Sequence, residues 1–482
     1  MNESFGLQFL DLHPFVRQTV LDRARGTIFG GALGDAIGLY TEFLSRDLSL
    51  AAYPDGKFQL VEPATELRND GHRNKFTKTA WTDDTDHALL ILLSYLHTNG
   101  KAFKPAEFAS RLRFWCEQGL RCLDQLPLGL GQTVVLDKHF LKDPIATAHR
   151  HWRASNYKAA PNGSLMRTYP LGIICLDKKL DETFQTAADF SRVTHADPRC
   201  IVSCCLATGL IRGVLRGETL TEDDIDTMIG LSLSWIEDWT ARENQNQKVQ
   251  GADASSPFTY PPFDVDEFNK HVRAESLAAL QLDDARTMGY VYKTLGAGIW
   301  TLRAAMRRID SQVSSLDSLF EELITSLVLC GGDADTNAAV AGSLLGAWVG
   351  FNALPASWKD GLMHVQWLSQ KCDALASIQE LMEAREELYQ REREFMEEYM
   401  VKSTLNAEGN WANEACGYLY TNEFCVLPSL LFDDNGVSWM DSSKSSPEFP
   451  ISVIFVDSWY LGQSWRSSRF YALRSSLESS GR

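Results

Sequence analysis

The chain has 482 residues, enough for one large domain with attachments or for two to three ordinary domains. Its 44% hydrophobic and 11% aromatic residues support a packed core and exclude global disorder. The formal charge of −17 argues against a nucleic-acid partner, because an acidic surface repels a phosphate backbone. A small phosphorylated ligand is not excluded, since it meets only the charges of its own pocket.

Targeting signals are not evident in the sequence. The N-terminal segment has neither the basic start nor the long apolar stretch of a secretory signal. No uncharged apolar run reaches about 18 residues, so we expect no membrane span and no membrane partner. The cysteines form no C-x-x-C pair, and Cys175, Cys204 and Cys205 lie in apolar runs. We therefore expect buried thiols in an intracellular, cytoplasmic protein, with a nuclear location also open.

The first predicted element is a helix over residues 15–38, in which glycines recur at every fourth position from Gly26 to Gly38. This spacing places the glycines on one face of the helix. Glycine costs about 1 kcal/mol at each interior helix position, so close approach of another backbone is the plain explanation. A similar series runs through Gly342, Gly346 and Gly350. The pattern predicts two smooth helices that pack tightly in the core, each joined to an acidic segment.

Helical periodicity recurs along most of the chain, whereas strand-like alternation is scarce before residue 400. Further helices are predicted over residues 86–97, 104–120, 199–215 and 317–330. The sequence therefore indicates an all-α fold, with one large domain over residues 15–370.

Three other segments differ from this pattern. Residues 243–264 are polar and rich in proline and serine, so we expect a surface loop. Residues 371–400 include a predicted charged amphipathic helix over 377–400. We expect this helix to pack on its own domain, and the alternative is packing on a partner helix. Residues 401–482 are rich in serine and tryptophan, carry short β-type runs, and form a C-terminal tail of unknown role.

The residues that carry chemistry lie in three acidic clusters. The first contains Asp35 and Glu42, and the other two are the segments 82–86 (TDDTD) and 332–337 (GDADTN). The last two clusters lead directly into apolar helices, where the helix dipole and capping account for one or two aspartates. Capping does not account for three aspartates within five positions, nor for the pair Gly331 and Gly332 that precedes Asp333.

Hydroxyls and carboxylates are the ligands that hard divalent cations prefer. If the two clusters meet, they can hold two ions about 3.5–4 Å apart with a shared carboxylate between them. The sequence therefore predicts a site for two divalent metal ions, Mg²⁺ or Mn²⁺.

Six segments, taken in order, resemble motifs of the ADP-ribosylglycohydrolase family. They are Gly34–Gly38 (GDAIG), Thr82–Thr85 (TDDT), Asn162–Arg167 (NGSLMR), Thr194–His195 (TH), Met288–Val291 (MGYV) and Gly332–Asn337 (GDADTN). The resemblance covers roughly residues 20–355. It departs from the family at residues 129–133 (GLGQT), where the first acid of a D-x-G-x-T loop is missing. Backbone amides of this loop can still cradle a phosphate.

The resemblance implies a compact multi-helix domain with a central cleft that holds two metal ions. It assigns the metal ligands to the second and third clusters, namely Thr82, Asp83, Asp84, Asp333, Asp335 and Thr336. It implies that Glu42 reaches the site on a mobile loop. Contacts to ADP-ribose are expected from Gly129, Gly131, Asn162, Gly163, Ser164, His195, Gly289 and Tyr290.

The expected reaction is hydrolysis of the ribose C1 glycosidic bond of an ADP-ribosylated protein or a small ADP-ribose conjugate, through an oxocarbenium-like state. Asp83 or Asp333 is expected to take a proton from the attacking water, and Glu42 to gate the site. One alternative is a catalytically inactive, ADP-ribose-binding or crystallin-like member of the family. Another is a metal-dependent phosphohydrolase that acts on a nucleotide. The sequence leaves open the linkage, the metal and the oligomeric state.

Overall fold

The structure is a computed structural model. It describes residues 7–11, 14–101, 103–129, 134–249, 260–311, 316–378, 431–433 and 436–438. The chain divides into two units, Met1–Tyr399 and Met400–Arg482, which are described separately.

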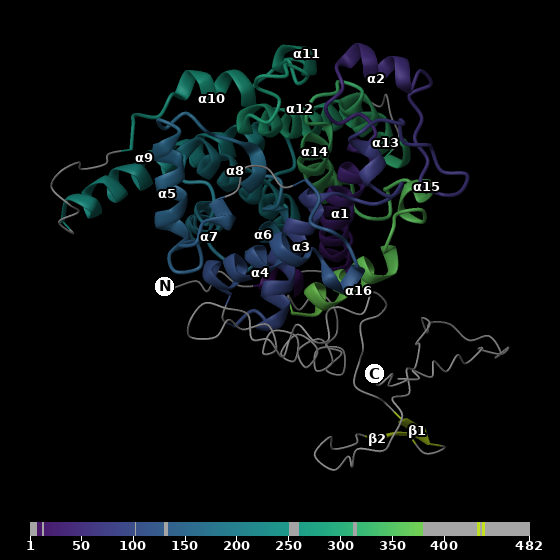
Figure 1. Ribbon diagram of the computed structural model, residues 1–482, viewed down its shortest axis with the longest axis horizontal. Helices are drawn as coiled ribbons and strands as arrows, with labels where there is room; N and C mark the ends of the chain where they lie inside the picture. Colours follow the sequence, from purple (N-terminus) through teal and green to yellow (C-terminus); the bar gives the residue numbers. More distant parts are fainter. Residues whose placement is uncertain are drawn as a thin grey trace, which may run out of the picture. The chain divides into compact units, whose positions relative to one another are not determined.

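Helices make up the first unit (Figure 1). The α-helices are α1 (Pro14–Gly38), α2 (Arg46–Ala52), α3 (Asp83–His97), α4 (Pro105–Gln118), α5 (Pro144–Ala154), α6 (Tyr169–Ile174), α7 (Leu180–Arg192), α8 (Pro198–Arg216), α9 (Glu222–Val249), α10 (Val265–Val272), α11 (Leu277–Leu280), α12 (Val291–Asp310), α13 (Leu316–Val328), α14 (Ala334–Val349), α15 (Ala356–Lys359) and α16 (Val365–Ile378). The 3₁₀ helices are η1 (Gln8–Asp11), η2 (Arg73–Lys75), η3 (Arg121–Leu123), η4 (Val134–Leu136) and η5 (Asn162–Ser164). This architecture confirms the predicted all-α fold.

In the second unit, the described residues form one short antiparallel pair. Strand β1 (Leu431–Asp433) pairs with β2 (Gly436–Ser438), and Phe432 lies opposite Val437. Residues 401–430 and 439–482, which contain most of the predicted tail, lie outside the described residues. So do residues 379–400 of the predicted amphipathic helix.

The two glycine-rich helices, α1 and α14, lie against each other at the centre of the first unit. A methyl group placed at Gly34 would lie 1.9 Å from the carbonyl oxygen of Ala338. One placed at Gly30 would lie 2.2 Å from the carbonyl oxygen of Gly342. Any larger residue would force the helices apart, so the glycine series is explained by close backbone approach. The tight packing predicted from the sequence is confirmed.

The core is completed by α8, which packs against α6, α7, α9, α12 and α14. Its start and end follow from its sequence. Asp197 caps the first turn by accepting from the Arg199 N–H, Pro198 occupies the first helical position, and Gly217 ends the helix at φ 74°.

Among the described helices, only α8 is long and apolar enough to cross a membrane. However, 94% of its most apolar window is buried by the rest of the protein. Cys200, Cys204 and Cys205 of this helix are buried, and so is Cys175, as the apolar runs predicted.

The predicted surface loop at 243–264 was wrong for residues 243–249, which continue α9. The polar side chains in this stretch are compatible with an exposed helix, and two of them hold it in place. Glu243 pairs with Arg192, and Asn244 accepts from the backbone N–H of Tyr260. Residues 250–259 lie outside the described residues.

Candidate functional site

The start of α3 is fixed by a carboxylate from another helix. Thr82 occupies the N-cap position but makes no capping bond with its own side chain. Asp35 of α1 accepts from the Thr82 N–H at 2.9 Å, the Thr85 N–H at 2.9 Å and the Thr85 hydroxyl at 2.6 Å. Asp35 therefore caps α3 from outside and sets the position of Asp84 relative to α1.

The start of α14 depends on the two glycines that precede it. Gly331 and Gly332 have φ values of 71° and 72°, a region that side chains rarely adopt. A methyl group at Gly332 would also lie 2.0 Å from the carbonyl oxygen of Leu282. The chain therefore makes a tight turn into the helix, with Asp333 at the N-cap position and Asp335 in the first turn.

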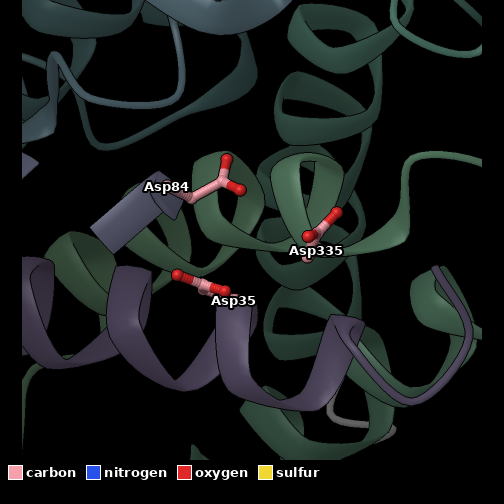
Figure 2. Close-up of side chains that lie close together, drawn as sticks. All are labelled: Asp35, Asp84 and Asp335. Carbon is pink, nitrogen blue, oxygen red and sulfur yellow. The ribbon is translucent and has the colours of Figure 1, made fainter. Parts of the chain in front are cut away.

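These helix starts bring carboxylates from α1, α3 and α14 together (Figure 2). One group consists of Asp35, Asp84 and Asp335, with one oxygen of each within 4.8 Å of the others. A second group, by the same measure, consists of Glu42, Asp333 and Asp335. Asp335 is the one member common to both groups. The two acidic clusters predicted to meet are therefore adjacent, and α1 adds a third.

The hydroxyls of the same motifs point into this region. The Thr82 hydroxyl lies 3.2 Å from Asp84 Oδ2 and 3.4 Å from Asp335 Oδ2. Thr336 is buried beside Asp84. Asp83 is half-buried, unlike Asp84, and lies next to Gly129, where a methyl group would be 1.8 Å from Asp83 Oδ1.

Among the described residues, His72, which pairs with Glu42, is the one basic side chain that forms an ion pair with these carboxylates. Burial and then repulsion from neighbouring carboxylates raise the pKa of Asp83, Asp84 and Asp335 well above the usual range. Burial also raises the pKa of Asp333. The buried Asp84 Oδ1 has no hydrogen-bond partner among the described residues. Divalent cations fit this set, because all its donors are oxygens and its negative charge needs a counter-charge.

Glu42 lies in turns that continue the end of α1, and its side chain is buried. Its carboxylate lies 2.5 Å from His72 Nε2, and its backbone carbonyl accepts from Arg73. The next residue, Phe43, donates its backbone N–H to the carbonyl of Gly332, beside the start of α14. These contacts hold Glu42 next to Asp333 and Asp335. Its predicted mobility stays a prediction.

The predicted substrate motifs are joined to this site through Asn162. The Asn162 side chain donates to Asp333 Oδ2 at 2.8 Å and to the Thr294 hydroxyl at 2.9 Å. Its backbone N–H donates to the carbonyl of Gly289 at 3.0 Å. A methyl group at Gly289 would lie 3.5 Å from Asp333 Oδ2. The motifs around Asn162 and Gly289 therefore lie side by side at the edge of the carboxylates.

His195 and Gly163 lie close together. The hydroxyls of Ser164 and Tyr290 instead form hydrogen bonds with other protein side chains. A methyl group at Gly163 would lie 3.3 Å from His195 Nε2. The Ser164 hydroxyl is fully buried and accepts from Ser191, so only its backbone is available to a ligand. The Tyr290 hydroxyl donates to Glu267 at 2.7 Å. Gly131 lies outside the described residues.

The sequence profile of the ADP-ribosylglycohydrolase family matches residues 16–391, which include every residue of this site. The chain belongs to the ADP-ribosylglycohydrolase family. The match extends beyond residue 370, and the domain boundary placed there stays a prediction.

Two curated relatives and one solved structure illustrate the similarity. The chain is 25% identical to the ADP-ribosylarginine hydrolase Tri1 of Serratia proteamaculans, over 74% of this chain and 79% of that protein. It is 24% identical to the ADP-ribosylhydrolase ARH3 of Bos taurus, over 70% of this chain and 88% of that protein. A solved ADP-ribosylglycohydrolase-related protein complex is 22% identical, covering 75% of this chain and 99% of that chain, with a TM-score of 0.46.

Sequence reasoning did not assign roles to two aspartates that organise the site. One is Asp35, whose capping of α3 was described above. The other is Asp86, which is buried and accepts from the indole N–H groups of Trp81 at 2.8 Å and Trp115 at 2.9 Å. Burial raises the pKa of Asp86 to about 7. Both aspartates lie within acidic motifs, which marked them as candidates. The motifs did not show that Asp35 caps a helix, or that Asp86 accepts hydrogen bonds from two tryptophans, rather than binding a metal.

Proposed function

We propose that this chain is a metal-dependent hydrolase that releases ADP-ribose by cleaving the bond at ribose C1, with two divalent cations, Mg²⁺ or Mn²⁺. The observation that carries the proposal is the pair of carboxylate groups that share Asp335. Membership of the ADP-ribosylglycohydrolase family supports a glycohydrolase rather than another metal-dependent activity. The ligands we propose are Thr82, Asp83, Asp84, Asp333, Asp335 and Thr336.

Bound cations would supply Lewis acidity toward the ribose hydroxyls and lower the pKa of a water molecule. The protein supplies the groups that move protons and hold the substrate. Asp83 and Asp333 are half-buried and therefore more accessible to water than Asp84 or Asp335. We assign proton transfer from the attacking water to one of these two acids. Asn162 orients Asp333 through its 2.8 Å hydrogen bond.

The loops around Gly163 and Gly129 are proposed to hold the diphosphate and ribose of ADP-ribose. Gly163 leaves room for His195 Nε2 to approach a ligand, and Gly129 leaves room for Asp83. The target on the other side of the scissile bond is an ADP-ribosylated protein or a small conjugate, with N- or O-linked ADP-ribose. The acidic chain, with its charge of −17, does not favour a nucleic-acid target.

We further propose a location inside the cell, in the cytoplasm or nucleus. No cysteine in the described part of the chain forms a disulfide, and most of them are buried. This arrangement is compatible with a reducing compartment.

The experiment that tests the function is incubation of the full chain with a panel of ADP-ribosylated substrates, with and without EDTA. Arginine-linked, serine-linked and polymeric ADP-ribose would be compared. We expect release of free ADP-ribose from at least one substrate, loss of turnover in EDTA, and recovery with Mg²⁺ or Mn²⁺. Full turnover in EDTA would contradict the metal proposal. Binding without cleavage would indicate an inactive member, and phosphate release would indicate a phosphohydrolase.

A further inference from the structure

Arg167, which follows the Asn162–Ser164 turn, is a buried cation without a carboxylate partner among the described residues. Only 2% of its surface is exposed. Its guanidinium lies 4.9 Å from the centre of the Phe108 ring, and Nη2 donates to the carbonyl of Phe190 at 3.2 Å. Burial lowers the pKa of Arg167 to about 10, so the group is still charged near neutral pH. A buried cation is ordinarily compensated by an anion or by hydrogen bonds. The hydrogen bonds of Arg167 therefore indicate which groups it holds in place.

The polar contact that leads from Arg167 toward the site passes through Thr194. Arg167 Nη2 donates to Thr194 Oγ1 at 2.7 Å, and the same oxygen lies 2.7 Å from His195 Nδ1. A guanidinium can only donate hydrogen bonds, so the hydroxyl accepts from it. Among the described residues, Thr194 Oγ1 has no third partner. His195 Nδ1 is therefore the acceptor within reach of its single hydrogen.

This contact is linked to which nitrogen of His195 carries the proton, because Nδ1 can accept from the hydroxyl only when its own proton is absent. Burial, followed by the charge of Arg167, lowers the pKa of His195 to about 3, so the imidazole is neutral near pH 7. A neutral imidazole has one N–H. When Nδ1 accepts from Thr194, that hydrogen lies on Nε2. Nε2 forms no hydrogen bond with any described residue, and it faces the turn at Gly163.

We propose that Arg167 and Thr194 are positioning residues that hold His195 in the Nε2–H tautomer, so that Nε2–H donates to an oxygen of the ADP-ribose diphosphate. The ligand in this inference rests on the proposed function, because it assumes that ADP-ribose occupies the Gly163 turn. A donor fixed in one tautomer loses little freedom when the ligand binds. The uncompensated charge of Arg167 further favours an anion at this place.

The test compares Thr194→Val with Thr194→Ser in the full chain. Valine has nearly the same shape as threonine but can neither accept from Arg167 nor donate to His195, whereas serine retains the hydroxyl. Titration calorimetry with ADP-ribose, in the presence of Mg²⁺, should show affinity weakened about tenfold or more by Thr194→Val. Thr194→Ser should stay within about threefold of the wild type. Equal affinities of the valine variant and the wild type would overturn the inference.

A second measurement requires no ligand and reports the tautomer directly. Nitrogen-15 NMR of the histidine-labelled protein gives the protonation of each imidazole nitrogen, and the His195 signals are identified by their loss in His195→Gln. We expect Nε2–H in the wild type and in Thr194→Ser, and a mixture of tautomers in Thr194→Val. Nδ1–H in the wild type would overturn the inference, even if the valine variant does not fold.

The two measurements separate this inference from the proposed function. If the wild type does not bind ADP-ribose but His195 carries its proton on Nε2, the proposed function and the assigned diphosphate fail. The positioning by Arg167 and Thr194 is then still supported. If the wild type binds ADP-ribose but His195 is protonated on Nδ1, the positioning fails and the proposed function stands.

Discussion

The two sides of the site are built in different ways. The carboxylate side consists of the acids and threonines at the starts of α3 and α14, together with Asp35 and Glu42. The loop side consists of the turns around Asn162, Gly289 and His195. On the carboxylate side the backbone is fixed by capping, but Asp84 Oδ1 is buried without a partner and the acids repel one another. On the loop side, by contrast, the Asn162 amide nitrogen donates to both Thr294 and Asp333.

This difference distinguishes the role expected of each side, which is metal binding for the carboxylate side and ADP-ribose binding for the loop side. Among the described residues, only His72 pairs with an acid of the carboxylate side, so under the proposed function bound cations complete this side. The loop side is already held by hydrogen bonds within the protein. Substitutions on the carboxylate side should therefore affect metal binding and turnover together. Substitutions on the loop side that do not touch Asp333, such as Thr194→Val, should affect ADP-ribose binding while leaving the metals in place.

The largest effect is expected from Asp335→Ala, because Asp335 belongs to both carboxylate groups. Its removal should weaken both metals and reduce turnover by on the order of 1,000-fold, since metal stabilisation of the transition state amounts to several kcal/mol. Calorimetry with Mn²⁺ and a turnover assay would measure the two effects. Asp360→Ala is the control, because Asp360 is exposed and belongs to neither group. Unchanged metal binding in Asp335→Ala would refute the shared role.

Gly129→Ala should have the next largest effect, because it displaces Asp83. The added methyl group would lie 1.8 Å from Asp83 Oδ1, at a backbone φ of 92° that is strained for alanine. Turnover should fall by on the order of 100-fold, as is typical when a reacting group is misplaced by about 1 Å. Gly217→Ala provides a matched control, since Gly217 has a φ of 74° but no atom within 4 Å of the added methyl group. Equal activities of the two variants would show that contact with Asp83 does not matter.

Glu42→Ala should reduce turnover less than the two variants above, and it should do so without the loss of metal binding expected for Asp335→Ala. Glu42 belongs to only one of the carboxylate groups, and it also contacts His72. Most of the Mn²⁺-binding enthalpy should remain, while turnover falls by about tenfold if Glu42 acts as a gate. The two quantities are measured as for Asp335→Ala. Loss of both ions in Glu42→Ala, with retention in Asp335→Ala, would reverse the ligand assignment and remove the gating role.

The smallest effect is expected from ending the chain at residue 400. None of the described residues of either side lies beyond this point, and the family match ends at residue 391. The truncated protein should keep the turnover of the full chain, provided that circular dichroism shows the same helical content. Reduced turnover in a folded truncation would mean that residues 401–482 complete the site or an assembly.

Much of this arrangement followed from local sequence patterns. The glycine series predicted the packing of α1 on α14, because four-residue spacing places small residues on one helix face. The TDDT and GDADTN segments predicted the two carboxylate clusters, because each combines a helix start with more acids than capping needs. The pairing of the clusters was a hypothesis from their shared ligand chemistry, which the family resemblance strengthened, because no local pattern connects motifs separated by about 250 residues.

Other features could not be read from sequence, for physical reasons. Capping of α3 by Asp35 is a contact between distant segments, and no local pattern distinguishes it from a metal ligand. The end of α9 was misjudged because a polar segment can be helical when long-range contacts such as Arg192–Glu243 hold it. The inward direction of the Ser164 hydroxyl depends on Ser191, which is provided by another helix.

The central claim is that two divalent cations share Asp335. The most direct measurement is anomalous X-ray scattering from crystals of the protein grown with Mn²⁺. We predict two manganese peaks, both in contact with the Asp335 carboxylate, one toward Asp84 and one toward Asp333. A single peak, or peaks that do not touch Asp335, would contradict this account.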